Sequence, residues 1–70
     1  MPEAYPKFPN AVFEIGDCDG NAFAILGRVR KVMKRAQVDQ ADIDAYTKEA
    51  TSGNYDHLLA TTYKWVTVSF

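Results

Sequence analysis

The sequence contains few of the residues that form disulfides or bind metal ions in small proteins. Its 70 residues include one cysteine, Cys18, and one histidine, His57. A single cysteine excludes a disulfide within the chain, and a structural zinc site needs about four ligands. No stretch approaches the ~20 apolar residues that span a bilayer. We therefore expect no metal, no cofactor and no membrane partner, and a cytoplasmic protein whose Cys18 stays reduced.

Length and net charge limit the classes that remain. A chain of this size makes one domain and buries only ~60% of its unfolded surface, so self-association is a common source of extra stability. We expect a homo-oligomer. The formal net charge of −1 argues against a protein that binds nucleic acid through its overall charge. Residues 1–9, which hold three prolines, are predicted to form an extended lead-in, and residues 10–70 a single compact domain.

The strongest local pattern lies between Gly20 and Ala36. Apolar side chains recur there with helical spacing and cover about one third of the helical circle. They are Ala22, Ile25, Leu26, Val29, Val32, Met33 and Ala36. The opposite side carries the cations Arg28, Arg30, Lys31, Lys34 and Arg35. This pattern predicts an amphipathic helix, with Asp19 or Asn21 as its N-terminal cap.

Two segments near the ends of the chain predict β-strands. Residues 10–16 alternate, and one face carries Ala11, Phe13 and Ile15. Residues 63–70 are rich in β-branched and aromatic side chains, and one face carries Val66, Val68 and Phe70. The other face carries Trp65, which is expected to be exposed. We expect the two strands to pair antiparallel and to leave free edges, which favour pairing with another copy.

The segment between the first helix and the last strand predicts two more helices. A helix over residues 39–50 begins at Asp39, in a sequence similar to a capping box, and its apolar positions are Ile43, Tyr46 and Ala50. Gly53 suits the left-handed position after that helix. Asn54 can cap a short third helix, residues 55–61, whose core residues are Leu58 and Leu59. The fold class is α+β in the order β-α-α-α-β, with the helices on one face of the sheet.

Two stretches resemble a family of very short phage, prophage and bacterial proteins. They are DGNAFAILGRVRK (Asp19–Lys31) and ATSGNYDHLL (Ala50–Leu59), which precede the strand that contains Trp65. The family comes without an assigned activity, so the resemblance carries no catalytic or binding residue over to this chain. It implies a phage accessory protein that works by binding, by blocking a host factor, sequestering a signalling nucleotide or regulating transcription.

One aromatic residue breaks the amphipathic pattern. Phe23 shares the outer face with the cations, one turn before Gly27 and two turns before Arg30. A glycine inside a helix costs ~0.5–1 kcal/mol relative to alanine, so it often marks the close approach of another group. If this face is functional, Phe23 stacks on a flat group while Arg30 and Lys34 hold anions. The alternative is that Gly27 packs against the second helix and Phe23 extends the apolar face.

His57 and Trp65 are further candidates. Asp56 is too near in the sequence to orient His57 for catalysis, which leaves packing or contact with a partner. A nucleophilic pair of Cys18 with His57 requires the fold to bring the two together. Trp65, exposed on its strand, would anchor an interface. The turn Asp17–Asn21 lacks the glycine and glutamate spacing of a calcium loop, so it is interpreted as a turn and a helix cap.

The sequence thus predicts a non-enzymatic, homo-oligomeric accessory protein that binds a nucleotide-like anion or blocks a host protein, of the kind that counters host defence. The predicted binding residues are Phe23, Gly27, Arg30, Lys34, His57 and Trp65. The alternative is a nucleic-acid-binding regulator that uses the basic face of the first helix. An enzyme is the third hypothesis, and no constellation of catalytic residues supports it.

Overall fold

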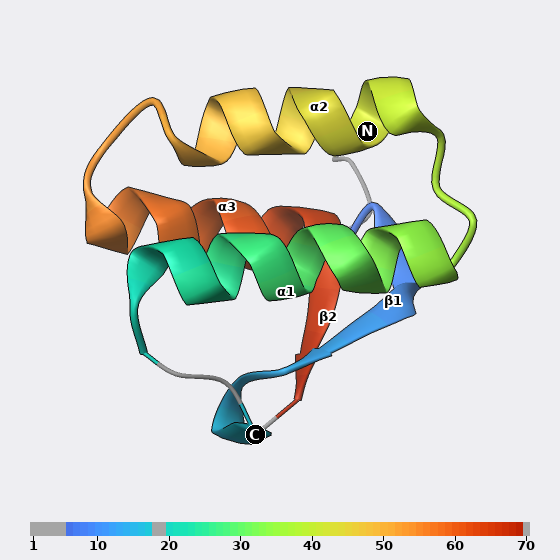
Figure 1. Ribbon diagram of the computed structural model, residues 1–70, viewed down its shortest axis with the longest axis horizontal. Coiled ribbons are helices and arrows are strands. Elements are labelled where there is room, and N and C mark those ends of the chain that lie inside the picture. Colours follow the sequence, from blue (N-terminus) through green and yellow to red (C-terminus); the bar gives the residue numbers. More distant parts are fainter. Residues whose placement is uncertain (1–5, 18–19, 70) are drawn as a thin grey trace, which may run out of the picture.

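The computed structural model describes residues 6–17 and 20–69 of the chain. The elements are β1 (Phe8–Glu14), a 3-10 turn η1 (Ile15–Asp17), α1 (Ala22–Arg35), α2 (Gln40–Ala50), α3 (Tyr55–Trp65) and β2 (Val66–Ser69). The three helices lie together, with the two strands below them in the view of Figure 1. The expectations that rest on residues 1–5, Cys18, Asp19 and Phe70 lie outside the described residues. They concern most of the lead-in, the Cys18–His57 pair, the Asp19 cap and the strand face of Phe70.

The two strands pair parallel, so the antiparallel pairing expected from the sequence is wrong. The partners are Phe8–Val66, Val12–Thr67, Phe13–Val68 and Glu14–Ser69, with an irregular register between the first two pairs. The direction follows from the path of the helices. The N–H of Lys7 donates to the carbonyl of Lys64 at 2.9 Å, which places the end of α3 beside the start of β1. Strand β2 therefore begins where β1 begins, and both strands run the same way.

Helix α3 is longer than the helix expected at 55–61, and the difference moves Trp65. The helix continues to Trp65, whose indole is 6% exposed. Its ring stacks on Phe8 at a centroid distance of 5.9 Å and meets Tyr46 edge-on at 6.0 Å. The ammonium of Lys7 lies 4.5 Å from the centroid of the same ring. The expected exposure of Trp65 is therefore wrong, because at the end of a helix the side chain enters the core.

The core lies between the helices and one face of the sheet. The faces of the first two helices predicted by periodicity are the buried ones, and they supply Ile25, Val29, Met33, Ile43, Tyr46 and Ala50. In β1, Ala11 and Phe13 are fully buried while Val12 is 45% exposed, so the predicted alternation is confirmed within the strand. Ile15, predicted on the same strand face, lies in η1 and is half-buried. Among the described residues, no buried side-chain nitrogen or oxygen lacks a hydrogen-bond partner. No helix of the described part is long and apolar enough to cross a bilayer.

The capping predictions for the helix ends are confirmed in part. The side chains of Asn21 and Asn54 accept main-chain N–H groups at 2.8 and 2.9 Å at the starts of α1 and α3. Asp39 precedes α2 without a capping bond from its side chain, so the predicted capping box does not form. The left-handed residue is Gln37, with φ of 65°, directly after the C-cap of α1. No described glycine has a positive φ, so the prediction for Gly53 is wrong.

Candidate binding face of helix α1

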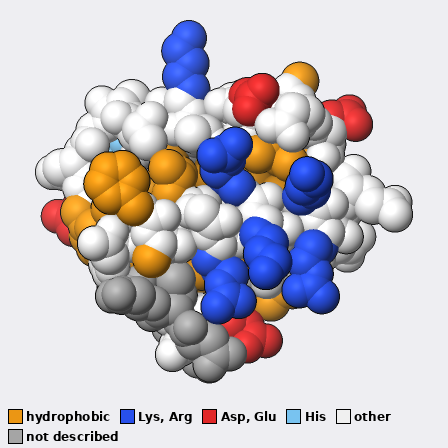
Figure 2. All heavy atoms as spheres, in the orientation of Figure 1, with side chains coloured by type: hydrophobic (Ala, Val, Ile, Leu, Met, Phe, Trp, Pro, Cys, Tyr) orange, Lys and Arg blue, Asp and Glu red, His pale blue; other side chains and the backbone are white. Residues whose placement is uncertain are grey.

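The outer face of α1 carries two neighbouring hollows. Figure 2 shows Lys and Arg side chains gathered over this helix, with apolar groups to their left. The apolar hollow has a volume of about 300 Å³ and is lined by Ala22, Phe23, Leu26, Ala50, Thr51, Gly53, Asn54, Tyr55 and Leu58. The basic hollow has a volume of about 280 Å³ and is lined by Gly27, Arg30, Lys31, Lys34, Gln40 and Ile43. The expected site therefore divides in two along one helix.

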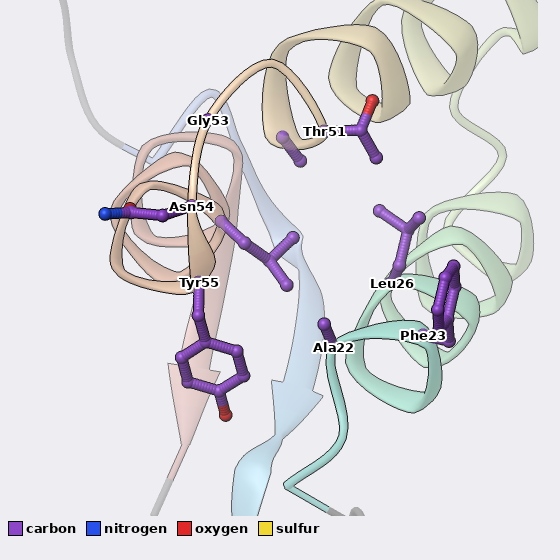
Figure 3. Close-up of a pocket in the computed structure, with 9 residues that line it drawn as sticks. Ala22, Phe23, Leu26, Thr51, Gly53, Asn54 and Tyr55 are labelled. Carbon is purple, nitrogen blue, oxygen red and sulfur yellow. The ribbon is translucent and has the colours of Figure 1, made fainter.

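The apolar hollow lies between the first turns of α1 and the turn that joins α2 to α3. In Figure 3, Phe23 and Leu26 stand on one side, Tyr55 on the other, and Ala22 between them. Phe23 is 83% exposed, because the cap at Asn21 starts the helix so that position 23 faces away from the core. The hydroxyl of Tyr55 donates to the carbonyl of Gly20 at 2.7 Å and holds the start of α3 against the turn before α1.

The basic hollow lies between the second half of α1 and the start of α2. Arg30, Lys31 and Lys34 are exposed, and no salt bridge joins any of them to a described residue. The nearest side-chain bond on α2 joins the amide of Gln40 to the Asp44 carboxylate at 2.9 Å. Three cations without a described acid partner favour an anion here, since charge-assisted hydrogen bonds are the strong ones.

Gly27 lines the basic hollow in open space. A Cβ atom built on this residue meets nothing within 4 Å, and its φ is not positive. Packing against α2 therefore does not account for the glycine, and neither does backbone conformation. A glycine in mid-helix lowers stability by ~0.5–1 kcal/mol relative to alanine. Among the described residues, neither a close packing contact nor a positive φ explains a glycine at this position.

The structure brings Gly27, Arg30 and Lys34 into one hollow and places Phe23 in the next. Arg30 lies seven positions after Phe23, which is ~10 Å along the helix axis. A single ligand that touched both would have to extend from one hollow to the other. Stacking on Phe23 and anion binding at Arg30 would therefore take place in two different hollows.

His57 and Trp65 lie in neither hollow. The Nε2 atom of His57 is 2.8 Å from the carbonyl of Glu49 and 3.1 Å from the hydroxyl of Ser52, so the ring holds the end of α2. The ring also lies close against Gly53, where a Cβ atom would come within 2.7 Å of it. These contacts give His57 a packing role. They also explain why residue 53 is glycine.

The sequence did not single out Lys31 or Gln40 as binding residues. Lys31 was visible only as one cation among five, and Gln40 joins the hollow through the packing of α2 on α1. Among the described residues, no group of three His, Cys, Asp or Glu side chains is placed to hold a metal ion. No family model, curated protein or solved structure matches the chain.

Proposed function

We propose that the protein is a non-enzymatic binding module of the phage accessory type, which holds a nucleotide-like anion in the basic hollow. The observation that carries the proposal is Gly27 in open space among three cations without a described acid partner. The proposed setting is the cytoplasm, which is the host's if a phage encodes the protein.

The chemistry of the lining fits a phosphate. The guanidinium of Arg30 offers a planar fork of N–H donors, while Lys31 and Lys34 offer compact positive charges. Without a side chain at Gly27, a phosphate can approach the helix backbone. Because the whole chain carries a net charge of −1, attraction of an anion depends on this local cluster, and salt screens it over about 10 Å.

The proposal is tested by titrating pyrophosphate and ATP into the full chain by isothermal calorimetry at two salt concentrations. Arg30→Ala combined with Lys34→Ala is expected to weaken binding by roughly tenfold or more, because each charged hydrogen bond contributes ~1.5–3 kcal/mol. The matched control is Arg28→Ala with Arg35→Ala. That pair removes the same charge from the same helix but does not line the basic hollow. A clear difference between the two double variants supports a built anion site.

A nucleic-acid-binding regulator is the second candidate, favoured by the cluster of α1 cations on one face (Figure 2). Duplex DNA binding measured by fluorescence anisotropy separates the two functions. If DNA binds, weakens steeply with salt and is lost equally in both double variants, the whole basic face is the site, not the hollow. Absence of binding to pyrophosphate and ATP, together with that result, would overturn the proposed anion site.

A further inference from the structure

The apolar hollow is distinct from the proposed anion site and holds a projecting group and a receiving surface side by side. Phe23 stands 83% exposed at its rim. The remaining lining residues are small or apolar, apart from the side chains of Thr51, Asn54 and Tyr55. Burial of an exposed phenyl ring against an apolar depression removes apolar surface from water and is favourable.

We propose that the apolar hollow receives Phe23 from a second copy of this chain, while Phe23 of the first copy enters the hollow of the second. A two-fold interface is self-complementary, so it requires a projection and a matching recess on the same surface. Phe23 and the hollow satisfy this requirement within one patch (Figure 3). A partner of unrelated sequence would have to supply its own aromatic group, whereas the second copy already carries one.

The distribution of charge around the apolar hollow is compatible with a contact between two copies of the chain. No residue that lines the apolar hollow is charged, although 24% of the chain is. All cations of α1 follow Phe23 in the sequence, from Arg28 to Arg35. A two-fold axis that passes beside Phe23 and perpendicular to α1 sends the two α1 helices in opposite directions. The basic halves then point away from each other, and like charges do not oppose across the contact.

The size of the patch sets the expected strength. The chain exposes 4694 Å² in all, so a standard interface of ~800 Å² per partner would take about one sixth of its surface. One phenyl ring and one hollow per chain cover less than that. We therefore expect a dimer in equilibrium with the monomer, with a population that depends on protein concentration.

The test is sedimentation velocity of the full chain over a wide dilution series, with circular dichroism to verify folding. Wild-type protein is expected to rise from 7.8 kDa toward twice that mass as concentration increases. Phe23→Ser removes the projection and should stay at the mass of one chain. The control is Val12→Thr, which removes an exposed apolar group on β1, away from the hollow, and should behave as wild type.

A second variant distinguishes insertion of Phe23 into the hollow from non-specific hydrophobic association. Ala22→Leu keeps Phe23 and adds apolar surface, but it fills the hollow. Insertion of Phe23 predicts that this variant stays monomeric, whereas non-specific hydrophobic association predicts a larger sedimenting mass. The proposal is overturned by a wild type that remains monomeric throughout, by a Phe23→Ser variant that still dimerises, or by an Ala22→Leu variant that associates more strongly. ATP titration of Phe23→Ser tests the anion site independently, because that residue does not line the basic hollow.

Discussion

Trp65 and Phe23 are two aromatic residues that differ sharply in exposure. Trp65 is 6% exposed and lies against Phe8, Tyr46 and Lys7, while Phe23 is 83% exposed at the rim of a hollow. Packing accounts fully for the first residue and not at all for the second. The same division separates Gly53, which His57 approaches closely, from Gly27, which stands in open space. Phe23 and Gly27, which packing within the described residues does not explain, both lie on α1.

The largest effect is expected from the matched removal of the two aromatic side chains. Trp65→Ala should lower the free energy of unfolding by ~3–5 kcal/mol, because it leaves a cavity beneath the helices. Phe23→Ala should change it by ~0.5 kcal/mol or less, as a surface substitution does. Urea denaturation at a concentration where the chain is monomeric measures both. Equal losses of unfolding free energy in the two variants would mean that Phe23 belongs to the core, as Trp65 does.

The two glycines should respond with opposite signs. Gly53→Ala forces the His57 ring to move and breaks its contact with Glu49, so a loss of ~1–3 kcal/mol is expected from overpacking. Gly27→Ala should raise stability by ~0.5–1 kcal/mol, since alanine is the better helix former and its methyl group meets nothing. The same Gly27→Ala variant should bind ATP more weakly. Unchanged binding would separate Gly27 from the anion site.

A third prediction concerns the hydroxyl groups inside the core. Thr62 donates to the carbonyl of Leu58 at 2.9 Å, so its oxygen accepts from Tyr46 at 2.8 Å. Burial raises the pKa of Tyr46 above its ordinary value of 10.0. The folded state therefore keeps this proton longer than the unfolded state does. Stability from Tyr46 is present below pH ~10 and is lost as pH rises further.

Tyr46→Phe tests this account against wild type in chemical denaturation at several pH values. At neutral pH the variant should be less stable by ~0.5–1.5 kcal/mol, through loss of one buried hydrogen bond. Above pH 10 the difference should shrink, because phenylalanine has no proton to lose. A difference that stays constant through the alkaline range would show that Tyr46 does not titrate differently in the folded state.

The candidate site was predictable only in part. Gly27, Arg30 and Lys34 lie one turn apart along α1, so helical spacing alone placed them together. The separation of Phe23 from that group, and the entry of Gln40 beside it, depend on where α2 and the turn before α3 pack against α1. His57 illustrates the reverse case. Its neighbours at the end of α2 were not visible in the sequence, and they give it a packing role.

Periodicity and capping chemistry by themselves determined the buried faces of α1 and α2, the alternation within β1 and the cap at Asn54. They also offered Asn21 as one of two candidate caps for α1. These features depend on residues within a few positions of one another. Tertiary structure alone decided the direction of strand pairing and the burial of Trp65. A two-residue period is the same in parallel and antiparallel strands, so the helices that return the chain to the start of β1 set the direction. Whether residues 62–65 extend α3 or begin β2 was set by the packing of Trp65 on Phe8 and Tyr46.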